Sequence, residues 1–195
     1  SIARKVIWDN KTAKIAVGKS VKIGVSITAR LKDVLNAVVI ASRESIISPS
    51  TNLLNSNGTR LSALNIQTQT NLLLTKIDRL AKNVNFKGGN LISSDSPVVH
   101  VQTSLFGGML AIDPQPMDLE GLGLVKLNLL SSSGVNEALS KLDYAILLSV
   151  QRLKKLEVLK SGLYGASNVD ALYQKISEAF GYSELPLGTL VNLIK

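Results

Sequence analysis

The fold class of this chain is decided by residues 17–41, VGKSVKIGVSITARLKDVLNAVVIA. Apolar or small residues recur there every three or four positions, as on one face of an α-helix. One row is Val17, Gly24, Leu31 and Val38, a second is Val21, Thr28 and Leu35, and between them lie Ile27, Val34 and Ala41. Since this pattern persists for about three heptads, it predicts a long amphipathic helix over 3–46 that packs in a bundle or coiled coil. Ser48-Pro49-Ser50 ends it, because proline cannot continue a helix.

The same spacing predicts two further long helices, over 59–83 and 134–164. The rows of the first are Ile66, Leu73 and Leu80, and Thr70, Ile77 and Val84. The rows of the second are Val135, Leu142, Ser149, Leu156 and Leu163, and Ala138, Ala145 and Leu159. Residues 48–58 are rich in Ser and Asn and read as a connection. Ser167 and Asp170 form a capping box for a shorter helix at 168–180.

The segment between the second and third long helices has strand character. Residues 99–103 alternate apolar and polar side chains, Gly107-Gly108 follows, and residues 109–112 are apolar, which together predict a β-hairpin. Residues 113–134 hold prolines and glycines, and we expect loop with short extended pieces.

The predicted fold is mainly α: a long antiparallel helical bundle or coiled coil with a small β-hairpin region inserted between the second and third long helices. We divide this one core domain into 1–84, the N-terminal core helices; 85–133, the hairpin and loop excursion; and 134–195, the C-terminal core helix, short helix and tail. The residues expected to form the core seam are Leu31, Leu35, Ile66, Leu73, Ile77, Leu142, Ile146 and Leu156.

The sequence presents no convincing catalytic or metal-binding set. Its 195 residues include no cysteine and one histidine, so disulfides, thiolate sites and paired-histidine metal sites are excluded. Asp118 and Glu120 read as a solvated loop, His100 as a surface or half-buried strand residue, and Gly121-Leu122-Gly123-Leu124 is not a phosphate loop. We expect no enzyme activity, metal or cofactor. The apolar runs are too short for membrane insertion, and no cleaved signal peptide is visible.

The positive charge is concentrated at the start of the chain. The net charge is +8, and residues 1–32 contribute eight basic groups and one acid. These basic groups lie opposite the apolar seam on a helical wheel, and Lys14, Lys19 and Lys22 are candidates for contact with a partner subunit. The alternatives are a simply solvated face, an anionic surface or a nucleic acid. Trp8 is the one aromatic in this stretch, so we expect no nucleic-acid binding.

Residues 76–92, KIDRLAKNVNFKGGNLI, resemble the motif in which a core helix ends before the β-region of bacterial flagellins. The residues that match the family motif are Asp78, Asn85, Phe86, Gly88, Asn90 and Leu91, whereas Lys87 stands where the family usually has Asn. Phe86 and Leu91 can anchor this turn on the bundle, and Gly88 permits a left-handed backbone. Two more stretches resemble the family in the right order: LEGLGL at 119–124, and VNEALSKLDYAI at 135–146 with Ser149, Gln151 and Arg152 a turn later.

The resemblance implies a short, alphaproteobacterial-type flagellin core that lacks the outer variable domain and at least the N-terminal channel-lining helix. It implies a secreted structural protein of the bacterial flagellum, a motility filament, which acts by helical self-assembly and is exported without a cleaved signal peptide. The implied partners are copies of itself and flagellar cap, junction and export chaperone proteins. Two alternatives stay open: a hook–filament junction protein of the same superfamily, or a helical binding module for an anionic partner.

Overall fold

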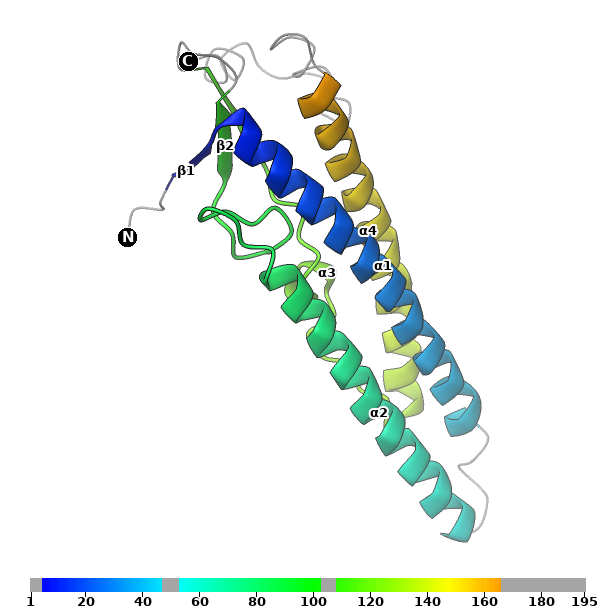
Figure 1. Cartoon of the computed structure of the whole chain (residues 1–195). Coiled ribbons are helices and arrows are strands. Elements are labelled where there is room, and N and C mark those ends of the chain that lie inside the picture. The colour runs from blue at the N-terminus through cyan, green and yellow to red at the C-terminus, as the bar shows by residue number, and fades with distance from the viewer. Residues whose placement is uncertain (1–4, 47–52, 103–107, 166–195) are drawn as a thin grey trace.

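The computed structural model describes residues 5–46, 53–102 and 108–165 (Figure 1). The long helices of this part are α1 (Asn10–Ile46), α2 (Leu53–Lys82) and α4 (Ser132–Gly165). Strands β1 (Val6–Trp8), β2 (Val99–Gln102) and β3 (Met109–Ile112) form a sheet at the end of the molecule where α1 begins, and the short α3 (Leu119–Leu122) contacts α2 and α4. The predicted mainly α fold class with a small β-region between the second and third long helices is therefore confirmed.

The start of the first helix differs from the prediction. The helix begins at Asn10 rather than at residue 3, because Asp9 caps it: the Asp9 carboxylate accepts a hydrogen bond of 2.6 Å from the Thr12 backbone N–H. The residues just before this cap, Val6–Trp8, are β-branched or aromatic and alternate buried and exposed, so they form β1 instead.

The sheet has the order β1-β2-β3. β2 and β3 are antiparallel with Val99 opposite Ile112, which confirms the predicted hairpin strands, although its turn at 103–107 lies outside the described residues. β1 pairs with β2 in parallel, Val6 opposite Val99, and this pairing was not anticipated. The side chains of Trp8, Val99 and Ile112, one from each strand, are buried.

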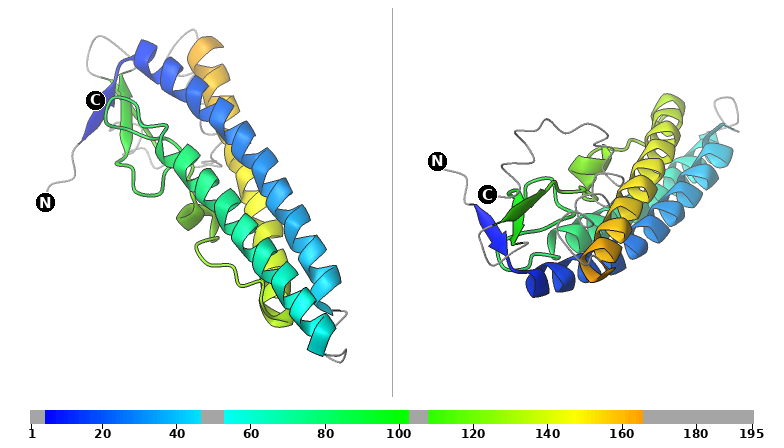
Figure 2. Two further views of the ribbon diagram at one scale, coloured as in Figure 1. Left: turned by 60° about the horizontal axis from the view of Figure 1, so that its bottom comes forward. Right: turned by 90° about the horizontal axis from the view of Figure 1, so that it is seen from above.

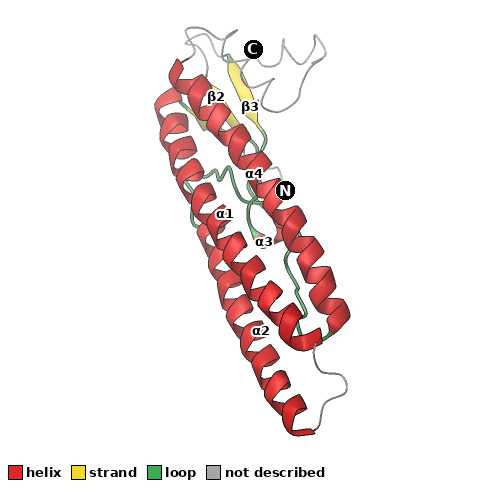
Figure 3. Ribbon diagram, turned by 90° about the vertical axis from the view of Figure 1, so that its right-hand side faces the viewer, coloured by secondary structure: helices red, strands yellow, loops and turns green. Residues whose placement is uncertain are grey.

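The seam between α1 and α4 follows a heptad pattern (Figure 3 shows these helices side by side). The buried heptad positions of α1 are Ala13, Val17, Ser20, Gly24, Ile27, Leu31, Val34, Val38 and Ala41. The expected row from Val17 to Val38 is thus buried throughout. In the second expected row Val21 and Leu35 are only half-buried, because steps of three and four alternate and the next buried residue after Val17 is Ser20.

The second helix is longer than predicted. It begins at Leu53 instead of 59, so the connection is shorter than the expected 48–58. The Asn, Ser and Gly of residues 55–58 each disfavour a helix by at most about 1 kcal/mol, and that is too little to end one.

The third long helix, α4, agrees with the prediction to within two residues, but its packing does not. A bundle of three long helices would bring it against both earlier ones, but among the long helices described it packs on α1 alone. Residues 113–131 lie between α2 and α4 and bond to both: Gln67 of α2 accepts from the Leu129 N–H, and Arg152 of α4 donates to the Gly121 carbonyl. This segment contains α3 rather than extended pieces. The helix expected at 168–180 lies outside the described residues.

The sheet and the loops gather on one side of the helices. Seen from above (Figure 2, right), the strands lie at one side of the molecule, and α1 and α4 run along the other side. The outward faces of these two helices are therefore covered by none of the described strands and loops.

Candidate functional site

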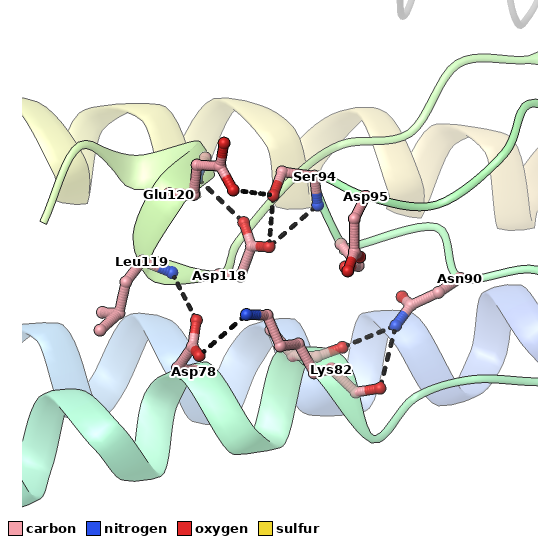
Figure 4. Close-up of polar contacts among 11 residues, drawn as sticks. Asp78, Lys82, Asn90, Ser94, Asp95, Asp118, Leu119 and Glu120 are labelled. Atoms are coloured by element: carbon pink, nitrogen blue, oxygen red, sulfur yellow. Dashed lines mark hydrogen bonds and ion pairs between the residues drawn. The ribbon is translucent and has the colours of Figure 1, made fainter. Parts of the chain in front are cut away.

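The flagellin-like turn motif closes the end of α2 (Figure 4). The Asn90 side-chain amide donates to the Ala81 carbonyl at 2.8 Å, and its oxygen accepts from the Ile92 N–H at 2.9 Å. Asn90 therefore caps the carbonyls left unpaired at the helix end and also turns the chain toward the sheet. Leu91, the next residue, is fully buried in the core.

Asp78, one helical turn before the end of α2, joins that helix to α3. Its carboxylate accepts from the Leu119 backbone N–H at 3.1 Å and lies 3.2 Å from the Lys82 ammonium group. Because the donor is the first residue of α3, one side chain fixes the spacing between two elements that are far apart in sequence.

The turn itself runs from Phe86 to Gly89, whose backbones exchange two hydrogen bonds. Lys87 and Gly88 both have left-handed backbones, with φ of 46° and 85°. Phe86 meets Trp8 edge to face, with ring centroids 6.5 Å apart, so the turn is anchored on β1. Of the six motif residues, the structure brings five into this junction and leaves Asn85 exposed.

We expected Asp118 to lie in a solvated loop, but its side chain is completely buried. One carboxylate oxygen caps α3 by accepting from the Gly121 N–H at 2.9 Å. The other accepts from the backbone N–H and the hydroxyl of Ser94, at 3.0 and 2.6 Å. A buried carboxylate with three donors is a structural brace. Glu120 beside it is exposed, and its carboxylate lies 3.3 Å from the same Ser94 hydroxyl, whose one proton goes to the closer Asp118.

Arg152 stands in a stretch that resembles the family, but its structural role was not predicted from the sequence. It occupies a core heptad position of α4, and its guanidinium donates to the Pro116 and Gly121 carbonyls at 2.6 and 2.8 Å. Burial lowers the pKa of this guanidinium from its ordinary value. The signal was present in the sequence: the row Ala138, Ala145 and Leu159 skips position 152, where a charged residue stands in an apolar row.

The expected seam residues fall into two groups. Four are buried: Leu31, Ile77, Leu142 and Leu156. Four are partly buried and pack against the same core cluster: Leu35, Ile66, Leu73 and Ile146.

The basic face of α1 is not free along its whole length. The Lys14 ammonium lies 5.2 Å from the centre of the Tyr164 ring, and Lys19 lies 4.7 Å from that of Phe86, so both make cation–π contacts within the chain. Lys22 is exposed and, within the described residues, makes no ion pair or ring contact. Of the three candidates, Lys22 is the one available to a partner.

An open groove of about 740 Å³ lies between α2, the 119–130 segment and α4. Gln67 bridges to the loop that lines it, through the Leu127 carbonyl and the Leu129 N–H. The acid in its wall, Glu137, is paired with Lys141 at 3.0 Å. The lining is aliphatic and amide-rich, without a group poised for acid–base chemistry.

His100 lies half-buried on β2, as predicted. Burial first, and then the nearby Lys5, lower the pKa of its imidazole. In the described ranges no group of three His, Cys, Asp or Glu residues could hold a metal ion. No helix among the described residues is long and apolar enough to span a membrane.

No protein-family model matches the chain, and no curated protein is similar to it in sequence. Its structure is similar to the crystal structure of Bacillus cereus flagellin, with a TM-score of 0.56 and 15% sequence identity, over 93% of this chain and 91% of that chain. The chain has a flagellin-like fold. At this sequence identity the similarity concerns the fold alone.

Proposed function

We propose that this chain is a structural subunit of a bacterial flagellar filament and acts by helical self-assembly. The observation that carries the proposal is the flagellin-like fold over nearly the full length of both chains compared. The flagellin-like motif at residues 76–92 supports it, because five of its six motif residues build the junction between α2, the sheet and α3.

The surface suits lateral packing between copies. Each long helix exposes large apolar side chains: Ile15, Val25 and Ile40 on α1; Leu64 and Leu72 on α2; Tyr144, Leu147, Val150 and Tyr164 on α4. Such residues along elongated faces are typical of interaction surfaces. Contacts between different faces of identical subunits generate a filament when they do not close into a ring.

In this proposal the seam and the turn motif keep the subunit rigid, so that its outer faces hold a fixed geometry. The role is structural and requires no catalytic group or cofactor. The protein would work outside the cell in the flagellum, with copies of itself as main partners and cap, junction and export chaperone proteins as further ones.

The proposal is tested by negative-stain electron microscopy of the purified full-length protein after seeding or salt-induced assembly. We expect long tubes of uniform width. Short rings would favour a hook–filament junction protein. Monomers that bind an anionic polysaccharide with a steep dependence on salt would favour a binding module. Either of these results overturns the filament proposal.

A further inference from the structure

The outward face of the sheet carries apolar side chains and no charged one. Opposite residues of neighbouring strands point to the same side, so the register assigns this face. Its strand residues are Ile7 of β1, His100 and Gln102 of β2, and Met109 and Ala111 of β3. Val98, directly before β2, continues the alternation. We call these six residues the outer sheet face.

The outer sheet face has the composition of a surface that is covered. A sheet face that stays in contact with water normally carries polar and charged side chains. Here Ile7 and Val98 are 46% and 43% exposed, and the nearest charged residues, Lys5 and Asp113, lie beyond the ends of the strands. The inner face of the same strands is buried in the core. The described helices and loops leave nearly half of the Ile7 and Val98 side chains uncovered.

The chain continues beyond α4 close to this face. α4 ends at Gly165, at the end of the molecule that carries the sheet (Figure 1), and the centre of its Tyr164 ring lies 5.2 Å from the Lys14 ammonium of α1. Ile7 is seven residues before Lys14, and seven residues span at most about 25 Å. The thirty residues of 166–195 are long enough to cross that distance several times.

Residues 168–180 of this segment have the pattern of an amphipathic helix. Their large apolar residues recur at helical spacing: Val169, Leu172, Tyr173, Ile176 and Phe180. At 100° per residue these five fall within an arc of about 100°, and polar residues such as Glu178 stand opposite. A helix of thirteen residues is marginal in water by itself, so its stability depends on packing this apolar arc against another surface.

The outer sheet face fits this apolar arc better than the neighbouring outward face of α1 does. On α1 the exposed Ile15 shares its arc with Lys11 and Lys22, whose ammonium groups would lose their water under an apolar helix. The outer sheet face carries no charge, so covering it removes no ion from water.

We propose that residues 168–180 pack as a helix across the outer sheet face of the same chain, with the apolar arc toward Ile7, Val98 and Met109. The sheet then becomes a middle layer between the core and this helix. Because α4 holds the segment next to the sheet, the contact forms at a high effective concentration. It is a contact within one copy of the chain, so it stands or falls independently of filament formation.

Tryptic cleavage after Lys175 tests the contact in the full-length protein, because the protease cuts the segment only when it is released. Ile7→Asp and Leu172→Asp place a carboxylate in the apolar contact from its two sides, and we expect each to speed this cleavage about tenfold or more. The controls are Ile40→Asp, at a 51% exposed position of α1 far from the sheet, and Ala171→Asp, outside the apolar arc. Both should be cleaved at the wild-type rate, and thermal unfolding checks that every variant keeps its folded core.

Cysteine pairs give a second test, because the chain contains no cysteine of its own. Ala111→Cys is combined with Leu172→Cys or Ile176→Cys, and at least one pair should form a disulfide within the chain about tenfold faster than Ala111→Cys with Glu178→Cys. Unchanged cleavage in both aspartate variants, or equal disulfide rates, would overturn the contact. Disulfides only between chains would mean that a second copy covers the face, which also overturns it. Each of these results leaves the proposed filament function untouched.

Discussion

The hydroxyl groups of Thr28 and Ser149 meet at 2.6 Å in the seam between α1 and α4, where both side chains are buried. The Thr28 oxygen also lies 2.9 Å from the Gly24 carbonyl. Since a hydroxyl has one proton, Thr28 donates to that carbonyl and Ser149 donates to Thr28. The pair is thus a directed chain of hydrogen bonds across the seam.

Thr28→Val breaks this chain and leaves the Ser149 hydroxyl buried without its acceptor. We expect a loss of about 1–2 kcal/mol in the free energy of unfolding, measured with urea. Thr28→Val combined with Ser149→Ala removes both polar groups and should cost less than the sum of the two single changes. Strictly additive losses would show that the hydroxyl groups are not coupled.

Gly89 lies where no side chain fits. A Cβ there would come 2.7 Å from atoms of both Trp8 and Val99, so Gly89→Ala should destabilise the protein by about 1–3 kcal/mol through overpacking. Gly18→Ala is the matched control: its Cβ meets nothing within 4 Å on α1, and alanine should stabilise the helix by about 1 kcal/mol. Thermal unfolding distinguishes the opposite signs, and a harmless Gly89→Ala would refute this packing.

Lys87 adopts a left-handed backbone with φ of 46°, although it stands where the resemblance expects Asn. Asparagine tolerates this conformation better than lysine, so Lys87→Asn should raise the free energy of unfolding by about 1 kcal/mol. Lys87→Ala retains the strained conformation and should bring no such gain. Equal effects of the two changes in a denaturant titration would mean that charge, not backbone strain, matters at this turn.

His100 should make stability fall in mild acid. Its pKa is lowered in the folded protein, mainly by burial, from the ordinary 6.5. Below about pH 6.5 the unfolded chain therefore binds more protons than the folded one, and the free energy of unfolding decreases as the pH falls through the folded-state pKa. His100→Gln should flatten the profile between about pH 7 and 5. An unchanged slope would assign the effect to other groups.

The sequence predicts best what depends on near neighbours. The heptads of residues 17–41 and 135–163 locate two helices, and alternation at 99–102 locates a strand. Asp78 and Asn90 follow from a motif. β1 escaped prediction because it has three residues and its partner strand begins at Val99, far along the chain. Helical periodicity in the residues that follow it outweighed so short a signal.

The roles of Asp118 and Arg152 depend on contacts between distant segments. A carboxylate in a Gly- and Pro-containing stretch reads as solvated until Ser94 is known to lie beside it. Arg152 shows as a gap in an apolar row, but the row does not say what fills the gap. Its acceptors at Pro116 and Gly121 emerge only when the chain has folded.

Repeating heptads can pair in more than one alignment. The polar contacts of Thr28, Ser149 and Arg152, which lie close to Gly24 along the seam, favour one alignment of α1 and α4 over the others. A slip of seven residues would press the Arg152 guanidinium against Val17 or Leu31, both fully buried, and strip it of its carbonyl acceptors. A misaligned pair of helices is therefore less stable than the native alignment. Every copy of the protein therefore presents its outer faces at the same relative height, which identical neighbours must share to repeat a contact indefinitely.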